Sequence, residues 1–201
     1  KNLKNFKVIH LAAQAGVRYS LKFPKTYIRS NLLGFWNVLE LSRKFKTKHF
    51  IFASSSSIYG ANKKFPFTEK DNTDQPIQLY AATKKSNEVI AYSYSNIFKL
   101  KVTGLRFFTV YGPWGRPDMA LFKFTNSILS GKKIDVYNNG KMTRDFTYVK
   151  DIVISIAKLI ESDAPRLVNK NDININKFSC PNEIFNIASN DPVQLDDFIK
   201  I

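Results

Sequence analysis

The stretch His49-Phe50-Ile51-Phe52-Ala53-Ser54-Ser55-Ser56-Ser57 decides the fold of this chain. Its apolar residues run directly into four serines, and a polar tract over residues 62–78 follows as a loop. A short apolar run of this kind is typical of a strand buried inside a parallel sheet. Residues 49–53 therefore predict a buried strand whose carboxyl end carries hydroxyl groups.

Outward from this strand, apolar runs alternate with segments of helical period. We expect further strands at 6–11, 102–108, 134–137, 146–149 and 183–188. We expect helices at 27–45, 80–98, 120–129, 151–160 and 195–201, and an Asn-rich loop at 166–181. Such alternation indicates βαβ units, a parallel sheet and the α/β class. Ligands of such sheets bind beyond the carboxyl ends of the strands, which points to residues 12–20, 54–60 and 109–118.

Composition limits the possible classes of protein. The 201 residues, 44% of them apolar, suffice for one domain or slightly more, and no apolar run reaches the ~18 residues of a membrane span. The single cysteine, Cys180, excludes an internal disulfide and favours a reducing compartment, so we expect a cytoplasmic protein. No Cys/His cluster has the spacing of metal ligands, so we expect no metal.

Net charge raises the question of nucleic acid. The balance is +15, from 31 Lys and Arg against 16 Asp and Glu. The lysines are scattered along the chain, and Lys, Asn and Ile are abundant together, which favours a coding bias. We therefore expect neither a nucleic-acid nor a membrane partner.

A pair of titratable residues carries the clearest chemical signal. Tyr80 and Lys84 are four apart in a predicted helix and so share one face. A phenol titrates near ~10, and a fixed ammonium one turn away favours the phenolate and lowers that pKa. The serines at 54–57 lie at a strand end before this helix, where hydroxyl groups can meet a substrate hydroxyl. Together these residues predict a catalytic site.

Five ordered segments carry a resemblance to a known family. They are residues 11–18 (LAAQAGVR), 54–60 (SSSSIYG), 80–85 (YAATKK), 104–118 (GLRFFTVYGPWGRPD) and 144–149 (RDFTYV). The chain resembles the extended short-chain dehydrogenase/reductase family, in its NAD-dependent epimerase/dehydratase branch, and most of all the UDP-glucuronate 4-epimerases. The resemblance implies an incomplete Rossmann-like doubly wound parallel sheet with part of a smaller C-terminal substrate-binding domain. It implies a partial NAD-binding domain over 1–112 and a mixed region over 113–201 with substrate-binding segments and returning Rossmann elements.

The same resemblance implies roles for single residues. Tyr80 is the expected base for the sugar 4-hydroxyl, Lys84 its pKa-lowering partner on the nicotinamide ribose, and Ser55 the third catalytic residue. The cofactor NAD is expected at Leu11, Ala12, Ala13, Tyr80, Lys84 and Phe107. A UDP-sugar is expected at Gly16, Val17, Arg18, Ser56, Ser57, Thr109, Arg116, Met119, Phe122 and Arg144. Relatives dimerise through the helices that match 27–45 and 80–98, so we expect a homodimer.

Structural roles compete with these functional ones at several positions. Phe107 is equally well explained as a core residue. Arg106 is expected in a structural ion pair, and Asp145 in a turn or a local pair. Trp114 is expected to anchor packing, and both histidines, His10 and His49, to be satisfied core residues.

The identity of two serines selects among the reactions of the branch. Resembling dehydratases carry an Asp-Glu pair at Ser56 and Ser57, and decarboxylases carry a Glu at Ser57. Without these acids, return of hydride to the other face of the 4-keto sugar is the simplest outcome, which is 4-epimerisation. Residues 115–118 (GRPD) resemble the glucuronate type, so we expect UDP-glucuronate to become UDP-galacturonate. The alternatives are a UDP-glucose or UDP-N-acetylhexosamine 4-epimerase, and an inactive nucleotide- or RNA-binding fragment.

The sequence departs from the family in one respect. The glycine-rich dinucleotide loop that opens family members is not among these residues, and Gly16 stands alone. The acidic residue that holds the adenosine ribose is missing as well. We therefore expect the 201 residues by themselves to bind NAD poorly and to show little or no activity.

Overall fold

The computed structural model describes residues 5–136, 140, 142–162, 165 and 180–200. The chain divides into two compact units. The first comprises residues 1–107 and 157–187, and the second comprises residues 108–156 and 188–201.

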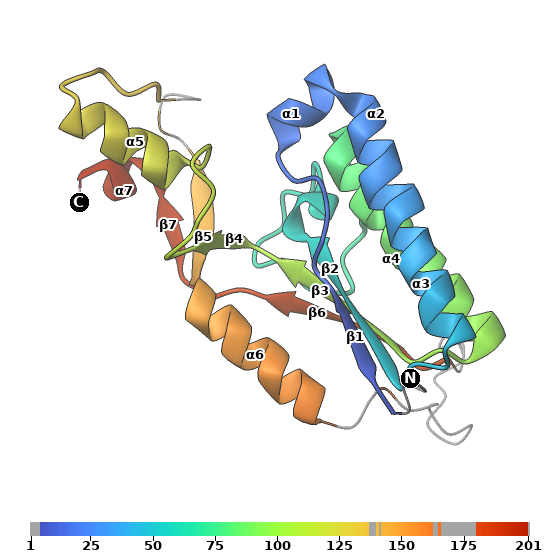
Figure 1. Ribbon diagram of the computed structural model, residues 1–201. Helices are drawn as coiled ribbons and strands as arrows, with labels where there is room; N and C mark the ends of the chain where they lie inside the picture. The colour runs from blue at the N-terminus through green and yellow to red at the C-terminus, as the bar shows by residue number, and fades with distance from the viewer. Residues whose placement is uncertain (1–4, 137–139, 141, 163–164, 166–179, 201) are drawn as a thin grey trace. The chain divides into compact units, whose positions relative to one another are not determined.

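A parallel four-stranded sheet forms the centre of the first unit (Figure 1). Its strands are β1 (Lys7–His10), β2 (His49–Ser55), β3 (Val102–Phe107) and β6 (Asn182–Ile187), hydrogen-bonded in the order β1-β2-β3-β6. All three pairings are parallel, which confirms the predicted α/β class. The jump from β3 to β6 shows that the sheet is completed by a strand from much later in the chain.

Helices pack on this sheet and bury its apolar residues. Between β1 and β2 the chain forms α1 (Val17–Lys22), α2 (Pro24–Tyr27), a π-helical turn η1 (Ile28–Gly34) and α3 (Phe35–Lys44). After β2 it forms the 3-10 turn η2 (Ser56–Tyr59) and α4 (Leu79–Phe98). In Figure 1, α3 and α4 run side by side, and Trp36 Nε1 donates to Tyr94 Oη across them at 2.8 Å. The core cluster contains Phe35, Leu39, Phe50, Phe52, Ala91, Leu100 and Val102.

The helix predicted over 27–45 is not one α-helix, because the π-helical turn η1 lies between α2 and α3. The π turn widens the helix by one residue, and such turns are frequent at functional sites. The spacing of apolar residues could not predict the π-helical turn, because Phe35 and Leu39 still face the core after it.

The second unit contains a small mixed sheet. Strands β4 (Thr109–Tyr111) and β5 (Thr143–Tyr148) pair in parallel, and β7 (Pro192–Gln194) is antiparallel to β5. Its helices are α5 (Ala120–Leu129), most of α6 (Val149–Glu161) and α7 (Leu195–Lys200). Residues 109–111, just beyond the strand predicted over 102–108, thus form a separate strand with a different partner.

Two predictions for this unit are wrong. Residues 134–136 form no strand, while Tyr137 lies outside the described residues. Trp114 anchors no packing, because its side chain is fully exposed on a residue with φ of 63°. The expected loop at 166–181 falls almost wholly outside the described residues.

Candidate active site

At the carboxyl edge of the first unit's sheet, two predicted site residues, Ser55 and Phe107, lie side by side. Ser55 of β2 stands beside Phe107 of β3, and Phe107 stands beside Ile187 of β6. Ser55 is buried, and its Oγ accepts a hydrogen bond from the Ser57 amide at 3.2 Å. This bond caps the turn η2, so the strand ends and the chain folds back at the predicted serine run. Ser56 and Ser57 are half-buried in that turn.

Helix α4 presents Tyr80, Lys84 and Glu88 on successive turns of one face. Lys84 is only 4% exposed, and its ammonium donates to the backbone oxygen of Ala53 at 2.7 Å. Burial lowers the pKa of Lys84 to about 8. At neutral pH the residue therefore still carries most of its charge, close to the carboxyl end of β2.

Tyr80 is half-buried at the first turn of α4. Its ring meets the ring of Tyr27 edge-on, with centroids 6.3 Å apart. Its backbone oxygen accepts from the Thr83 hydroxyl at 2.8 Å. The four-residue spacing to Lys84 is thus realised on a helix, as the sequence predicts.

The predicted cofactor and substrate residues between 11 and 18 follow β1. Leu11 and Ala12 are exposed, and Ala13 is half-buried. Gly16 precedes α1 with φ of 102°, a conformation that favours glycine. Val17 and Arg18 form the first turn of α1, so this segment is a loop at the carboxyl end of β1.

Two residues for which the sequence predicts no role in the site, Tyr27 and Asn31, hold this loop in place. Tyr27 is fully buried, and its hydroxyl donates to the backbone oxygens of Ala15, at 2.8 Å, and Gly16. Asn31, in the π-helical turn, accepts from the Gln14 amide at 2.8 Å and donates to the Gln14 oxygen at 3.0 Å.

The Asn31 amide also donates to the Thr83 hydroxyl on α4 at 3.1 Å. The loop after β1 and the Tyr80 helix are therefore joined through one amide. A buried asparagine at the centre of an amphipathic helix was the available signal for this role.

The prediction that both histidines are satisfied core residues is wrong in part, because His10 is only half-buried and the buried Nδ1 of His49 has no hydrogen-bond partner among the described residues. His49 is fully buried and shares a 2.8 Å hydrogen bond with the Thr103 hydroxyl, and burial lowers its pKa to about 4. His10 is half-buried, with its ring 5.7 Å from Phe35 and 6.2 Å from Phe50. Burial, and then the charge of Lys84, lowers the pKa of His10, so the ammonium acts at the end of β1 as well.

Arg106 forms the predicted ion pair, with Glu88 as its partner at 2.9 Å. Phe107, beside it, is half-buried in the sheet edge, which is compatible with packing and with a ligand contact.

The remaining predicted substrate residues belong to the second unit. Thr109 begins β4, Arg144 is exposed on β5, and Met119 and Phe122 flank the start of α5. Arg116 holds Asp118 with both nitrogens of its fork, at 2.9 and 2.8 Å, on an exposed surface. Exposed pairs of this kind are worth only ~0–1 kcal/mol, so another carboxylate can take the place of Asp118 at little cost.

Asp145, in the same unit, makes one contact of the predicted local kind, from the Thr147 hydroxyl at 3.3 Å, but its shorter hydrogen bonds are to a residue far along the chain. Its carboxylate accepts from the Ser189 amide and hydroxyl, both at 2.9 Å, and so joins β5 to the segment before β7.

No helix in the described ranges is long and apolar enough to cross a membrane. Over residues 5–136, 140, 142–162, 165 and 180–200, no cluster of His, Cys, Asp or Glu could hold a metal ion.

A parallel sheet with a serine ending one strand, and a Tyr-x-x-x-Lys pair on the next helix, is the arrangement of Rossmann-type short-chain dehydrogenases/reductases. The sequence model of the NAD dependent epimerase/dehydratase family matches residues 5–176, and the chain belongs to that family.

Two relatives illustrate the similarity. The chain is 55% identical over 197 residues to Protein CapI of Staphylococcus aureus. It is 51% identical over 196 residues to a probable UDP-glucuronate 4-epimerase of Rhizobium meliloti. Each comparison covers 96% of this chain but 58% of the relative, so the chain spans less than two thirds of their length.

The chain is also similar to solved structures of 4-epimerases. A UDP-glucuronic acid 4-epimerase from Bacillus cereus, in complex with UDP-glucuronic acid and NAD, matches with a TM-score of 0.83 and 32% identity, over 96% of this chain and 57% of that one. A UDP-glucose 4-epimerase from Thermotoga maritima, with UDP-glucose, matches with a TM-score of 0.82 and 31% identity, over 96% and 59%.

Proposed function

We propose that this chain carries the catalytic residues of an NAD-dependent 4-epimerase that interconverts UDP-glucuronate and UDP-galacturonate. The observation that carries the proposal is the position of the buried Lys84 ammonium. It is bonded to Ala53, two residues before Ser55 in β2, and Lys84 lies one helical turn after Tyr80. The relatives named for UDP-glucuronate 4-epimerisation support the choice of substrate.

The proposed base is the Tyr80 phenol. An ammonium held one turn away in a desolvated site favours the phenolate, which lowers the proton affinity of the oxygen. Tyr80 then takes the proton of the sugar 4-hydroxyl and later returns it, while Ser55 provides a hydroxyl near the same oxygen. Lys84 suits this work because its pKa of about 8 leaves it charged at neutral pH.

The residues after β1 fit NAD. Ala12 is exposed and Ala13 is half-buried, so small side chains leave the backbone at this strand end accessible. The Lys84 charge reaches the same strand end, since it lowers the pKa of His10. Leu11, Ala12, Ala13, Lys84 and Phe107 would hold the cofactor. When bound, NAD supplies a hydride acceptor and donor for C4 of the sugar.

The serines at positions 56 and 57 favour epimerisation over the elimination of water. Both are serines in the turn η2, and serine does not supply the acid that removal of water needs. The 4-keto sugar therefore takes its hydride back, on the opposite face for the epimer. Arg116 favours a uronate, because guanidinium binds carboxylate with two parallel hydrogen bonds.

The test is to assay the protein, expressed from its full coding sequence, with UDP-glucuronate, UDP-glucose and UDP-N-acetylglucosamine. We expect UDP-galacturonate from the first substrate at the highest kcat/KM. Tyr80→Phe should lower kcat by roughly 10²- to 10⁴-fold, the usual contribution of a general base, without changing the unfolding midpoint. A preference for either neutral sugar would replace the proposed substrate, and full activity of Tyr80→Phe would refute the mechanism.

We propose that the protein acts as a homodimer, joined through η1, α3 and α4. Large apolar side chains are exposed there, namely Leu33, Trp36, Leu41, Val89, Tyr92 and Ile97. A second copy of the same face would bury them.

Light scattering after size exclusion tests the dimer. Leu33→Glu with Val89→Glu should yield monomers. Leu129→Glu is the control, because Leu129 is 81% exposed on α5, outside the proposed interface. A dimer that persists in the double variant contradicts this interface.

A further inference from the structure

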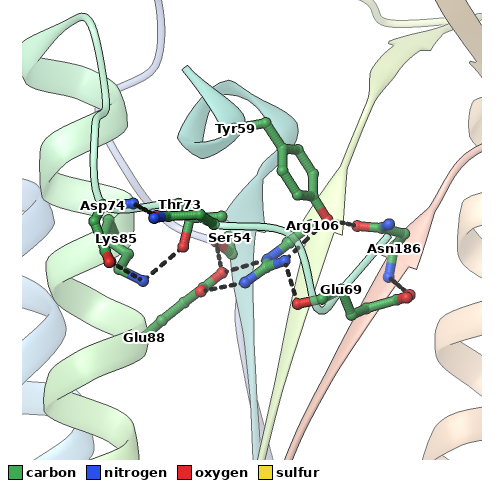
Figure 2. A network of polar contacts seen from close by, with 10 residues as sticks. Ser54, Tyr59, Glu69, Thr73, Asp74, Lys85, Glu88, Arg106 and Asn186 are labelled. Atoms are coloured by element: carbon green, nitrogen blue, oxygen red, sulfur yellow. Dashed lines mark hydrogen bonds and ion pairs between the residues drawn. The ribbon is translucent and has the colours of Figure 1, made fainter. Parts of the chain in front are cut away.

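A buried ion pair joins helix α4 to the middle of the sheet (Figure 2). Arg106 of β3 donates from Nε to one oxygen of Glu88 at 3.0 Å and from Nη2 to the other at 2.9 Å. The Glu88 and Arg106 side chains are 8% and 5% exposed. The Ser54 hydroxyl of β2 donates to the same carboxylate at 2.5 Å. Three elements therefore meet at Glu88.

The hydrogen bonds of Glu88 and Lys84 to β2 set the register between α4 and β2. Lys84 is bonded to Ala53, and Glu88, one turn later, is bonded to Ser54, the next residue of the strand. Two consecutive residues of β2 are thus fixed to two consecutive turns of α4. Ser55 follows Ser54 directly, and Tyr80 precedes Lys84 by one turn. The distance between the proposed base and the proposed serine depends on this register.

The other side of Arg106 fixes the segment after the serines. Its Nη1 donates to the Tyr59 hydroxyl at 2.9 Å and to the Glu69 backbone oxygen at 3.2 Å. The Tyr59 hydroxyl in turn donates to the side-chain oxygen of Asn186 in β6 at 2.6 Å, and the backbone amide of Asn186 donates to the Glu69 carboxylate at 2.7 Å. Figure 2 shows the guanidinium between Glu88 and the Tyr59 ring. Both ends of the turn η2, Ser54 before it and Tyr59 at its close, are therefore tied to Arg106 or its partner.

We propose that Glu88 and Arg106 are positioning residues for catalysis, which hold Ser55 and the turn η2 in register with Tyr80 and Lys84. This inference rests on the proposed function, because it assigns the pair to the reaction of that site. Neither side chain is required to touch the sugar or the cofactor.

The physical argument is that stability alone gives little reason for this pair. Desolvation of two charges can exceed their attraction, and replacing a buried ion pair by apolar residues of similar size is often neutral or stabilising. The pair does fix geometry, because hydrogen bonds are directional. The Arg106 guanidinium and the Glu88 carboxylate bind each other, the Ser54 hydroxyl and the Tyr59 hydroxyl at angles that apolar side chains do not reproduce. A small misplacement of catalytic groups is costly, about 10²-fold for 1 Å.

The experiment compares the wild-type protein, expressed from its full coding sequence, with Glu88→Met/Arg106→Met. We expect the double variant to unfold at a similar urea concentration, with kcat about 10- to 100-fold lower and KM within about threefold. Thr103→Val is the matched control, because it removes the buried bond to His49 that joins β2 and β3 at the other end of the sheet. The control should lose stability and keep kcat. A double variant with wild-type kcat would overturn the proposal.

A second readout separates this proposal from the proposed function. Amide hydrogen exchange at Ser55, Ser57 and Tyr59 should accelerate in the double variant and stay unchanged in Thr103→Val. If the wild type converts no UDP-sugar, the proposed function fails, and the exchange data alone decide whether the pair positions the turn. If the double variant does not fold, Ser54→Ala, which keeps both charges, replaces it. Unchanged exchange at Ser55 and Ser57 in that variant would refute the positioning role.

Discussion

The ammonium of Lys84 lies 2.7 Å from the backbone oxygen of Ala53 and is almost completely buried. The bond fixes a charge next to the serine run, but the charge must be removed from water when the chain folds. Burial lowers the pKa of Lys84 from 10.5 to about 8. The lysine therefore costs stability, and this cost depends on pH.

The sign of the effect follows from proton binding. Below pH ~8 Lys84 is charged in both the folded and the unfolded state, and the cost is fully present. Between pH ~8 and ~10.5 the unfolded state binds more protons, so stability rises with pH. Above that range the residue is neutral in both states and the cost has disappeared.

Lys84→Met should abolish this pH dependence. The difference in unfolding free energy between the variant and the protein that keeps Lys84 should change by about 2 kcal/mol from pH 7 to pH 9.5, at ~1.36 kcal/mol per pKa unit. Both proteins carry Tyr80→Phe, so that the phenol proposed to respond to Lys84 does not contribute, and the protein that keeps Lys84 gains stability as the pH rises. Urea unfolding at the two pH values measures the difference. A constant difference would show that the buried ammonium does not titrate in this range.

Asn31→Ala should release the loop after β1. The substitution removes two hydrogen bonds to Gln14 and one to Thr83 in a buried site. We expect a loss of about 2–3 kcal/mol in unfolding free energy, because the groups left behind are desolvated. Exchange of the Gln14 amide, which donates to Asn31, should accelerate.

Asn37→Ala is the matched control for this change, because Asn37 is exposed on the neighbouring helix α3. It should change the unfolding free energy by no more than ~0.5 kcal/mol and leave the exchange rate of the Gln14 amide unchanged. A slow Gln14 amide in Asn31→Ala would mean that other contacts hold the loop.

Local patterns were sufficient to predict much of the fold. The apolar run ending in serines is β2 and its carboxyl end, and the Tyr80–Lys84 spacing lies on one helix. The strand follows from a short continuous apolar run, and the shared face of Tyr80 and Lys84 follows from the 3.6-residue period of a helix. The predicted ion pair of Arg106 follows from a charge inside an apolar strand, which burial obliges to find a partner.

Contacts between distant residues could not be predicted in the same way. No local rule connects Asn31 with Gln14, or Asn186 with Tyr59, because the fold brings these groups together. The π-helical turn at Ile28–Gly34 also leaves the apolar period nearly intact. Trp114 shows the reverse error, since a large aromatic residue suggests packing but lies exposed at a sharp turn.

Gly60→Ala should disturb the turn that closes the serine run. Gly60 has φ of 57°, and an added Cβ would lie 2.1 Å from the backbone oxygen of Gln75. Backbone strain and this clash act together, so we expect a loss of at least about 2 kcal/mol in unfolding free energy. Gly131→Ala is the control, because Gly131 has φ of 63° with open space around its Cβ.

The Gly131→Ala control should cost only about 1 kcal/mol, the strain without the clash. Urea unfolding of both variants separates the two contributions. Equal losses would show that the loop at Gln75 moves aside freely.

Arg116→Lys tests the recognition of the sugar carboxylate. Lysine keeps the positive charge but lacks the planar fork that now holds Asp118 through two nitrogens. If this fork binds the uronate, the dissociation constant for UDP-glucuronate should rise about tenfold, a loss of ~1.4 kcal/mol, while that for UDP-glucose stays constant. Lys123→Arg, an exposed cation on α5, is the control and should change neither constant. Titration calorimetry with both nucleotides on the protein expressed from its full coding sequence measures the effect. Equal weakening of both sugars by Arg116→Lys would mean that Arg116 serves the nucleotide or the local fold rather than the carboxylate.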